Sequence, residues 1–318
     1  MKRILQKSLI ALSVLAVVGC GGSDDDKAKF SLGISDAPVD NAEAVVIELD
    51  AIRLTKSNTD GSSDEILVDV FTDENGDTVE TVQVNLLDFQ GSSQIKIVDE
   101  AQNIELDNGT YDMELTVVDS GSYVLFHDDA TEHPIKVPSS RLRLGEFPVS
   151  NEAVQINDEP AYTIEFDLRQ SLVQRGNANN NNGYIIKPHG VRVVSLAGHI
   201  EGNVDSNYTN LGQCSVYLYG KEVTEYGDMF DSADSNFAQP DGDITASAPL
   251  ATAVVDETGM YSIGFVQAGS YQLALMCGTQ VDDNVQFDGL TIPSAADITP
   301  DVAVVEVVSQ QTANINFD

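Results

Sequence analysis

The chain has 318 residues, which is long enough for two domains that each bury a core of their own. Its 51 aspartates and glutamates stand against 16 lysines and arginines and give a formal net charge of −35. Such a charge repels polyanions, so no nucleic-acid partner is expected, and the absence of tryptophan argues against a large aromatic ligand.

The N-terminal segment, residues 1–19, has the pattern of an export leader. Basic residues precede an apolar run from Leu9 to Val18, which is shorter than the roughly 20 residues of a membrane-spanning helix. The run ends at Gly19 and Cys20, and a polar stretch follows. This ending resembles the lipobox of bacterial lipoproteins, which implies cleavage before Cys20 and acylation of that residue. An ordinary leader that happens to be cut before a cysteine is the alternative.

The residue after Cys20 bears on the final location of the protein. In lipoproteins of two-membrane bacteria an aspartate there usually directs retention in the inner membrane, and this chain has Gly21. The resemblance therefore implies a lipid-anchored protein of the outer membrane that faces the periplasm or the outside. Acyl chains contribute about 0.8 kcal/mol per buried methylene, so several chains hold a domain durably. Residues 20–29 are expected to be a lipidated, flexible tether.

Alternating apolar and polar side chains dominate the rest of the chain, and no 3.6-residue apolar period persists for a dozen residues. The sequence therefore predicts an all-β protein. The strands expected in the first domain, residues 30–196, cover 45–54, 66–71, 79–87, 95–98, 111–117, 162–168 and 184–196. A change of apolar phase predicts a bulge or a bend near Ala51, and one helical turn is expected within residues 167–175.

A series of short motifs runs through the first domain. The motifs are SLGISDAP at 31–38, VNLLDF at 84–89, GTY at 109–111, VPSS at 137–140, FDLRQSL at 166–172 and IKP at 186–188. In this order they resemble a domain of bacterial surface lipoproteins catalogued as domain of unknown function 4382. The resemblance implies a lipoprotein context and a β-sandwich, and it implies no activity.

Residues 197–318 are expected to form a second domain. A GHIEGNV stretch, a strand at 214–219 and the turn glycines Gly259 and Gly269 resemble the carboxypeptidase regulatory-like domain, a seven-stranded, prealbumin-type sandwich related to starch-binding-like folds. A long acidic insertion at about 225–249 departs from that pattern. The predicted architecture is therefore two Greek-key β-sandwiches of the immunoglobulin or prealbumin type.

Cys214 and Cys277 are the two cysteines that remain once Cys20 is assigned to lipid. Both stand on the apolar phase of an alternating strand, and an exported protein folds in an oxidising compartment. The sequence predicts a disulfide between them. Two buried free thiols that act as small apolar side chains are the alternative.

Two groups of polar residues offer metal-ligand chemistry. Asp73, Asn75 and Asp77 stand at alternate positions, as the oxygen ligands do at the start of a calcium loop, but a solvated Asn-Gly hairpin is the favoured interpretation. His127 and His133 flank several acids and could serve zinc, although a solvated acidic loop is favoured there too. Calcium is the one cofactor left open.

Tyr217 and Tyr219 stand on the phase opposite Cys214, Val216 and Leu218, so the sequence predicts that both face outward. An outward aromatic pair can stack on a sugar ring or on a partner surface. The two rings would otherwise form the contact with the first domain.

The chain has neither a Gly-x-Ser-x-Gly elbow nor a His-Glu-x-x-His helix, and no catalytic residue is predicted. The expected function is a non-enzymatic binding or structural module at the cell surface, with adhesion, matrix assembly or glycan capture as its role. Glycan capture rests on resemblance of fold. Expected partners are the membrane, through the anchor, and a polysaccharide or envelope protein. The alternatives are a divalent-cation-dependent scaffold or adhesin and, less favoured, an envelope hydrolase.

Overall fold

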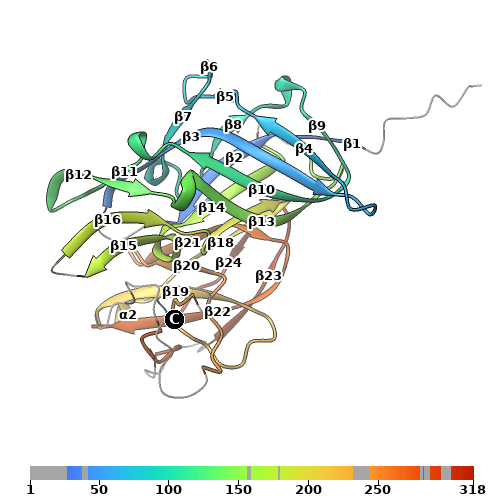
Figure 1. Cartoon of the computed structure of the whole chain (residues 1–318). Helices are drawn as coiled ribbons and strands as arrows, with labels where there is room; N and C mark the ends of the chain where they lie inside the picture. Colours follow the sequence, from blue (N-terminus) through green and yellow to red (C-terminus); the bar gives the residue numbers. More distant parts are fainter. Residues whose placement is uncertain are drawn as a thin grey trace, which may run out of the picture.

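A computed structural model describes residues 27–37, 42–155, 159–177, 180–231, 244–279, 282, 287–294 and 302–318. The predicted leader, Cys20 and most of the tether lie outside these residues. The chain is an all-β, sandwich-type protein, as the sequence predicts. Figure 1 shows two sheet-built bodies, called here the N-terminal half (residues 27–196) and the C-terminal half (residues 197–318).

Among the residues described in the N-terminal half, seventeen strands are found. They are β1 (Lys27–Lys29), β2 (Leu32–Ala37), β3 (Ala42–Ser57), β4 (Ser63–Val68), β5 (Phe71–Thr72), β6 (Thr78–Val79), β7 (Val82–Asn85), β8 (Ile95–Val98), β9 (Glu105–Asp107), β10 (Gly109–Val117), β11 (Tyr123–Phe126), β12 (Asp129–Lys136), β13 (Arg141–Val149), β14 (Tyr162–Asp167), β15 (Leu172–Asn177), β16 (Asn180–Ile186) and β17 (Val191–Ser195). The short helices are η1 (Leu86–Asp88), η2 (Glu100–Gln102), η3 (Asp119–Gly121), η4 (Pro138–Ser140) and α1 (Leu168–Ser171).

A nine-stranded sheet and a four-stranded sheet enclose the first core. The larger sheet has the order β13-β10-β3-β11-β12-β16-β15, and β4 and β7 also pair with β3. The smaller sheet has the order β17-β14-β2-β8, in which β2 and β14 run parallel. Alternating side chains of both sheets meet in one cluster that includes Phe30, Leu49 and Phe166, all fully buried. Burial of this cluster is the main stabilising contribution to this half.

Several local predictions are confirmed. The pairing of β10 with β3 passes from Ala51 to Leu49, so Asp50 is skipped and the predicted bulge lies there. The predicted helical turn is α1, and its N-cap Asp167 accepts a hydrogen bond from the Gln170 amide at 3.3 Å. Residues 27–29, expected in the tether, instead form β1, because Ala28 is buried between two exposed lysines and the strand pairs with β9.

The C-terminal half is also built from two sheets. Its elements are β18 (Ala197–Asn203), α2 (Ser206–Thr209), β19 (Gln213–Gly220), β20 (Ala251–Val254), β21 (Met260–Gln267), β22 (Gly269–Gly278), β23 (Val302–Val307) and β24 (Thr312–Asn314). One sheet has the order β21-β18-β24 and the other β20-β19-β22-β23, with a separate apolar cluster between them. The carboxypeptidase regulatory-like assignment of this half stays a prediction.

The structure joins Cys214 to Cys277 in a disulfide. The two residues face each other across β19 and β22, and their Cα atoms are 4.1 Å apart. Both side chains lie in the core cluster of this half. The bridge therefore ties the two central strands of the four-stranded sheet.

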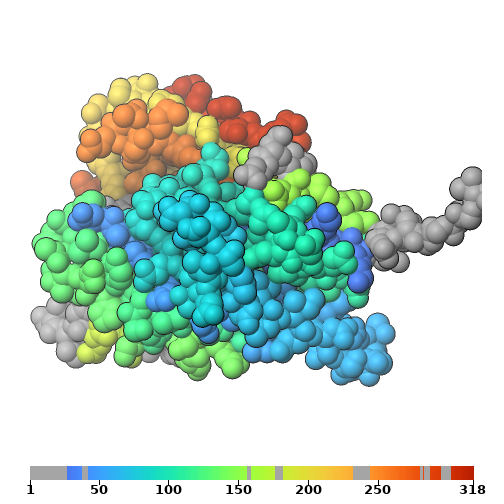
Figure 2. All heavy atoms as spheres, turned by 90° about the horizontal axis from the view of Figure 1, so that it is seen from above, coloured from blue at the N-terminus to red at the C-terminus, as the bar shows by residue number. Residues whose placement is uncertain are grey.

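The two halves pack closely along one face, as Figures 1 and 2 show. Strand β21 lies against β2, β14 and β17 of the smaller N-terminal sheet. At Gly264 of β21 a Cβ atom would stand 1.9 Å from the Gly91 carbonyl oxygen, so the close approach requires glycine there. The Arg192 guanidinium donates to the carbonyl oxygens of Leu250 and Gly264 at 3.4 and 3.2 Å. Backbone contact and hydrogen bonds thus hold the halves together.

Candidate functional site

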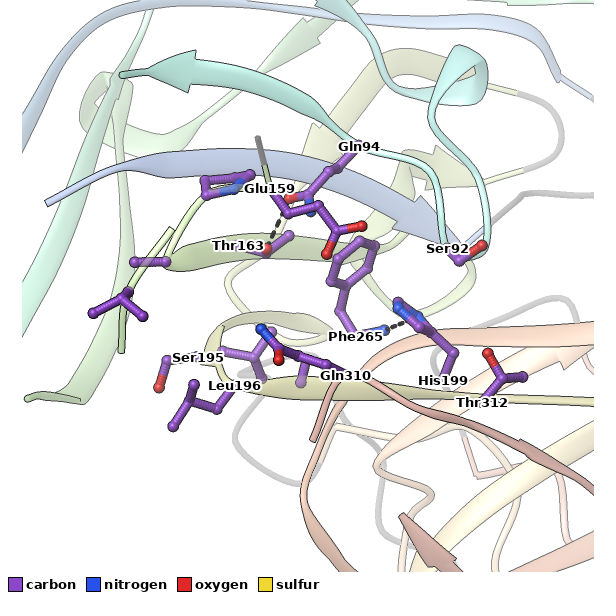
Figure 3. A pocket seen from close by; sticks show the side chains of 15 residues that line it. Ser92, Gln94, Glu159, Thr163, Ser195, Leu196, His199, Phe265, Gln310 and Thr312 are labelled. Carbon is purple, nitrogen blue, oxygen red and sulfur yellow. Dashed lines mark hydrogen bonds between the residues drawn. The ribbon is translucent and has the colours of Figure 1, made fainter. Parts of the chain in front are cut away.

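A cavity of about 300 Å³ lies between the two halves, and we call it the central cavity (Figure 3). Strands β14 and β17 form its N-terminal wall, and β18, β21 and β24 its C-terminal wall. Its lining residues are Ser92, Gln94, Val154, Glu159, Pro160, Ala161, Thr163, Val194, Ser195, Leu196, Ala197, His199, Phe265, Gln310 and Thr312. Most of these side chains carry a hydrogen-bonding group.

Gln94 is held in the N-terminal wall by two neighbours. The Thr163 hydroxyl on β14 donates to Gln94 Oε1 at 2.9 Å. Gly33 on β2 leaves room for the amide, because a Cβ atom there would stand 2.2 Å from Gln94 Oε1. Gly33 belongs to the SLGISDAP motif. The motif glycine therefore sets the position of a cavity side chain.

His199 on β18 forms the opposite wall together with Phe265. The Phe265 backbone N–H donates to His199 Nδ1 at 3.3 Å, and the two rings meet edge to face with centroids 4.9 Å apart. Burial lowers the pKa of His199, and the carboxylates of Glu159 and Glu201 oppose this shift. A backbone N–H can only donate, so Nδ1 is unprotonated and the neutral ring carries its proton on Nε2. His199 thus offers a donor.

The backbone around the central cavity is strained. Leu196, Phe265 and Gln310 have φ of 52°, 46° and 58°, and they make up half of the six non-glycine residues with positive φ in the described part of the chain. Such conformations are costly for bulky side chains and persist only where surrounding contacts enforce them. The Gln310 N–H donates to the Ala197 carbonyl at 2.6 Å and fixes one of these segments. Strain concentrated around one cavity is typical of a functional site.

The charge of the central cavity is negative. Glu159 contributes an exposed carboxylate, and no lysine or arginine is among the described residues of the lining. The whole chain has a net charge of −35, so the surrounding field has the same sign. Amide, hydroxyl, imidazole and carboxylate groups beside one aromatic ring can bind a polar ligand that is uncharged or cationic. An anionic ligand would meet repulsion.

A buried acid lies on the same face of β14 as Thr163. Glu165 is 1 % exposed and stands opposite Arg192 of β17, whose Nη2 is 3.9 Å from Glu165 Oε1. Burial raises the pKa of Glu165 to about 7, and the Arg192 charge lowers it in part. Two residues further, the Asp167 carboxylate accepts the Thr252 N–H of the C-terminal half at 2.9 Å. Acids of the FDLRQSL segment and its strand therefore face the second half.

The outward orientation predicted for Tyr217 and Tyr219 is wrong. Both side chains are fully buried, because a second layer that includes Met229 and Ile292 covers the outer face of β19. The Tyr217 hydroxyl donates to Asp282 Oδ2 at 2.9 Å, and the Tyr219 hydroxyl donates to the Gly227 carbonyl at 2.5 Å. Burial raises the pKa of both hydroxyls. Alternation along β19 is as predicted, but both faces of the strand are covered.

The predicted metal ligands lie in two hairpins. Asp73 Oδ1 accepts hydrogen bonds from the backbone N–H groups of Asn75 and Asp77 at 2.9 and 2.8 Å. These residues form the turn between β5 and β6, which is the hairpin that the sequence favours. His133 lies on β12 and its Nε2 is 2.7 Å from Asp129 Oδ2, whereas His127 lies in the turn before β12. Within the described residues, no group of three or more histidines, cysteines and acids is placed to hold a metal ion. Calcium binding stays an untested prediction.

Sequence reasoning missed the central cavity. Its polar residues come from segments far apart in the chain, and single serines, threonines and glutamines carry no local signal. In the sequence, Gly33 and His199 stand out only as parts of motifs. The positive φ of Phe265 could not be predicted from its residue type, since phenylalanine rarely adopts a positive φ.

A family model described as a domain of unknown function (DUF4382) matches residues 27–188. The match spans more than half of the chain, so the chain belongs to this family. It contains the motifs at 31–38 and 166–172 and therefore Gly33 and the strand that carries Thr163. A comparison with curated proteins found no match.

Solved structures of pilins were also found to be similar to this chain. A streptococcal ancillary pilin is 10% identical, with 92% of this chain and 68% of that chain covered and a TM-score of 0.23. The minor pilin of Streptococcus agalactiae is 12% identical, with 90% and 94% covered and a TM-score of 0.19. The shaft pilin of Lactobacillus rhamnosus GG is 9% identical, with 91% and 96% covered and a TM-score of 0.23. TM-scores this low carry no argument about function.

In the described part of the chain, no helix has the length and apolar character needed to cross a membrane.

Proposed function

We propose that this protein is a lipid-anchored, non-enzymatic binding module of the outer membrane, and that it captures an uncharged carbohydrate in the central cavity. The anchor is Cys20, whose sequence context resembles a lipobox. The observation that carries the proposal is the lining of the cavity, where the side chains of Gln94, His199, Gln310 and Glu159 converge with several hydroxyls beside one aromatic ring.

A sugar suits this lining better than an apolar ligand does. Sugars present many hydroxyl groups that donate and accept at once, and each desolvated hydroxyl needs a partner on the protein. The His199 Nε2–H and the Gln310 amide supply donors, and the Glu159 carboxylate supplies an acceptor. The Phe265 ring adds an apolar contact for the C–H groups of a sugar face. An acidic sugar is disfavoured by Glu159 and by the net charge.

Binding should be tested with the mature chain carrying Cys20→Ser, which removes the acyl site and leaves the folded part unchanged. The protein is applied to an array of neutral, amino and acidic glycans. We expect signals on neutral glycans that persist in the presence of a chelator. Signals that require calcium would instead support the cation-dependent scaffold.

A cavity-filling variant assigns the signal to this site. Ala197→Leu places three additional carbons in the central cavity and should abolish glycan binding, whereas Thr110→Leu, on the exposed outer face of β10, should leave it unchanged. Melting temperatures verify that both variants are folded. Equal binding by wild type and a folded Ala197→Leu variant would refute the assignment. A pull-down from the native envelope distinguishes a polysaccharide from an envelope protein as the partner.

A further inference from the structure

A second hollow, the β8 groove, lies beside the central cavity on the N-terminal half. It has a volume of about 830 Å³ and lies between the β5–β6 hairpin and the edge strand β8. Thr72, Thr78, Phe89 and Lys96 are among its lining residues. It is larger and more open than the central cavity, so it suits an extended ligand.

Gln94 lines both hollows. It directly precedes β8, so it stands where the interface between the halves gives way to the surface of the N-terminal half. Thr163 holds its Oε1, and Gly33 keeps the space beneath it open. The two hollows therefore adjoin at the Gln94 side chain.

We propose that the two hollows bind one linear oligosaccharide, with one sugar in the central cavity, the following sugars in the β8 groove, and Gln94 against the linkage between them. This inference rests on the proposed function. The central cavity, at about 300 Å³, is at the lower end of the sizes of ligand pockets and holds about one sugar. The larger groove accommodates the rest of the chain.

The chemistry of the β8 groove fits neutral sugars. Thr72 and Thr78 supply hydroxyls, and the Phe89 side chain, which also packs on the core, supplies an apolar contact. The Lys96 ammonium is paired with the Asp99 carboxylate at 2.6 Å, so its charge is already balanced. The carboxylates of Asp73 and Glu74 also line the groove. The groove therefore continues the hydrogen-bonding and negatively charged character of the central cavity, which disfavours an acidic sugar in both.

The first test measures how affinity depends on ligand length. The neutral homo-oligomer that gives the strongest array signal is titrated calorimetrically into the Cys20→Ser chain, from the monosaccharide to the hexasaccharide. We expect the hexasaccharide to bind at least about tenfold more tightly than the disaccharide. Phe89→Leu, which keeps an apolar side chain against the core, should weaken binding of the hexasaccharide and leave binding of the monosaccharide unchanged.

The second test displaces Gln94 by a substitution outside the lining of both hollows. Gly33→Ala places a methyl group against Gln94 Oε1 and should displace the amide, with a loss of about tenfold for the hexasaccharide. Gly220→Ala is the matched control, because a Cβ atom there meets nothing within 4 Å. If Gly33→Ala does not fold, Gln94→Leu removes the amide at similar volume and should give the same loss.

The outcomes separate this inference from the proposed function. Equal affinity for the monosaccharide and the hexasaccharide would overturn the linear-chain inference and leave a single-sugar site in the central cavity. The linear-chain inference would also be overturned if a folded Phe89→Leu variant kept the full preference for long chains. Unchanged hexasaccharide binding by folded Gly33→Ala or Gln94→Leu would overturn it as well. No binding to any glycan would overturn both. Length-dependent affinity that is lost on substitution at residues 89 and 94 supports the inference.

Discussion

Glu165 gives the sharpest test of how the two halves are joined, because the structure predicts that removing its charge stabilises the protein. The side chain is 1 % exposed at the contact between the halves, and burial raises the pKa from 4.5 to about 7 despite the nearby Arg192. At about 1.4 kcal/mol per pH unit, this difference corresponds to about 3 kcal/mol. Above the pKa of the folded state, the folded protein therefore holds a carboxylate that would be more stable in water.

The sign of the pH dependence follows from proton uptake. Between about pH 4.5 and 7 the folded chain keeps a proton on Glu165 that the unfolded chain has lost, so the free energy of unfolding falls as the pH rises. Glu165→Gln removes this dependence. We expect wild type and variant to be similar in stability at about pH 4, and the variant to be more stable by up to about 3 kcal/mol at about pH 8.

Urea unfolding followed by circular dichroism at several pH values measures both quantities. Burial also raises the pKa of Asp36 and that of Asp282, so these groups also make the stability of the wild type depend on pH. The test is therefore the difference in free energy of unfolding between variant and wild type at each pH, rather than the pH dependence of the wild type alone. Glu132→Gln, at an exposed position on β12, is the control for loss of one negative charge. If Glu165→Gln is less stable than wild type at about pH 8, the Arg192 ion pair outweighs burial, and the reasoning fails.

Three further predictions concern the C-terminal half. Replacing both Cys214 and Cys277 with alanine should lower the free energy of unfolding by about 4 kcal/mol, since their separation of 63 residues makes the closed loop long. If reductant leaves the melting temperature of the wild type unchanged, this prediction is contradicted. Gly264→Ala should separate the halves, because its Cβ atom would overlap a carbonyl oxygen of the N-terminal half. Small-angle scattering should then show a larger radius of gyration, and an unchanged radius would refute the close approach. Tyr219→Phe removes the hydrogen bond to the Gly227 carbonyl and should lower the free energy of unfolding by about 1 kcal/mol, as measured by urea unfolding. An unchanged free energy of unfolding would contradict this contribution of the buried hydroxyl.

Period-two alternation was sufficient to predict an all-β chain, because a strand with one covered face buries its apolar side chains at every second position. The sandwich arrangement was implied by the family resemblance. The bulge at Asp50 could be predicted from alternation too, since a change of phase within one strand requires an inserted residue. Alternation fails at Tyr217 and Tyr219. It separates the two faces of β19 but does not show that residues around Met229 and Ile292 cover the second face.

The central cavity could not be predicted, because it is a property of the contact between halves. Gln94 is placed by Gly33 and Thr163, and His199 by the Phe265 backbone, and each of these pairs joins strands that are distant in sequence. A polar side chain at such a position has the same local pattern as one exposed to solvent. Only the packing of β21 on the smaller N-terminal sheet turns these positions into a lining.

The motifs that match the family gain a physical explanation from this packing. Asp167 and Arg169 of the FDLRQSL segment are buried against the second half, where Asp167 accepts from Thr252 and Arg169 donates to the Asp282 carbonyl at 2.8 Å. Buried charges without partners are strongly destabilising, so this face of the N-terminal half requires a second surface that offers complementary backbone groups. Gly33, in the other strand of the parallel pair, shapes the cavity on the same face. The family segment thus specifies a docking face, and the proposed ligand site forms where the docked half leaves that face incompletely filled.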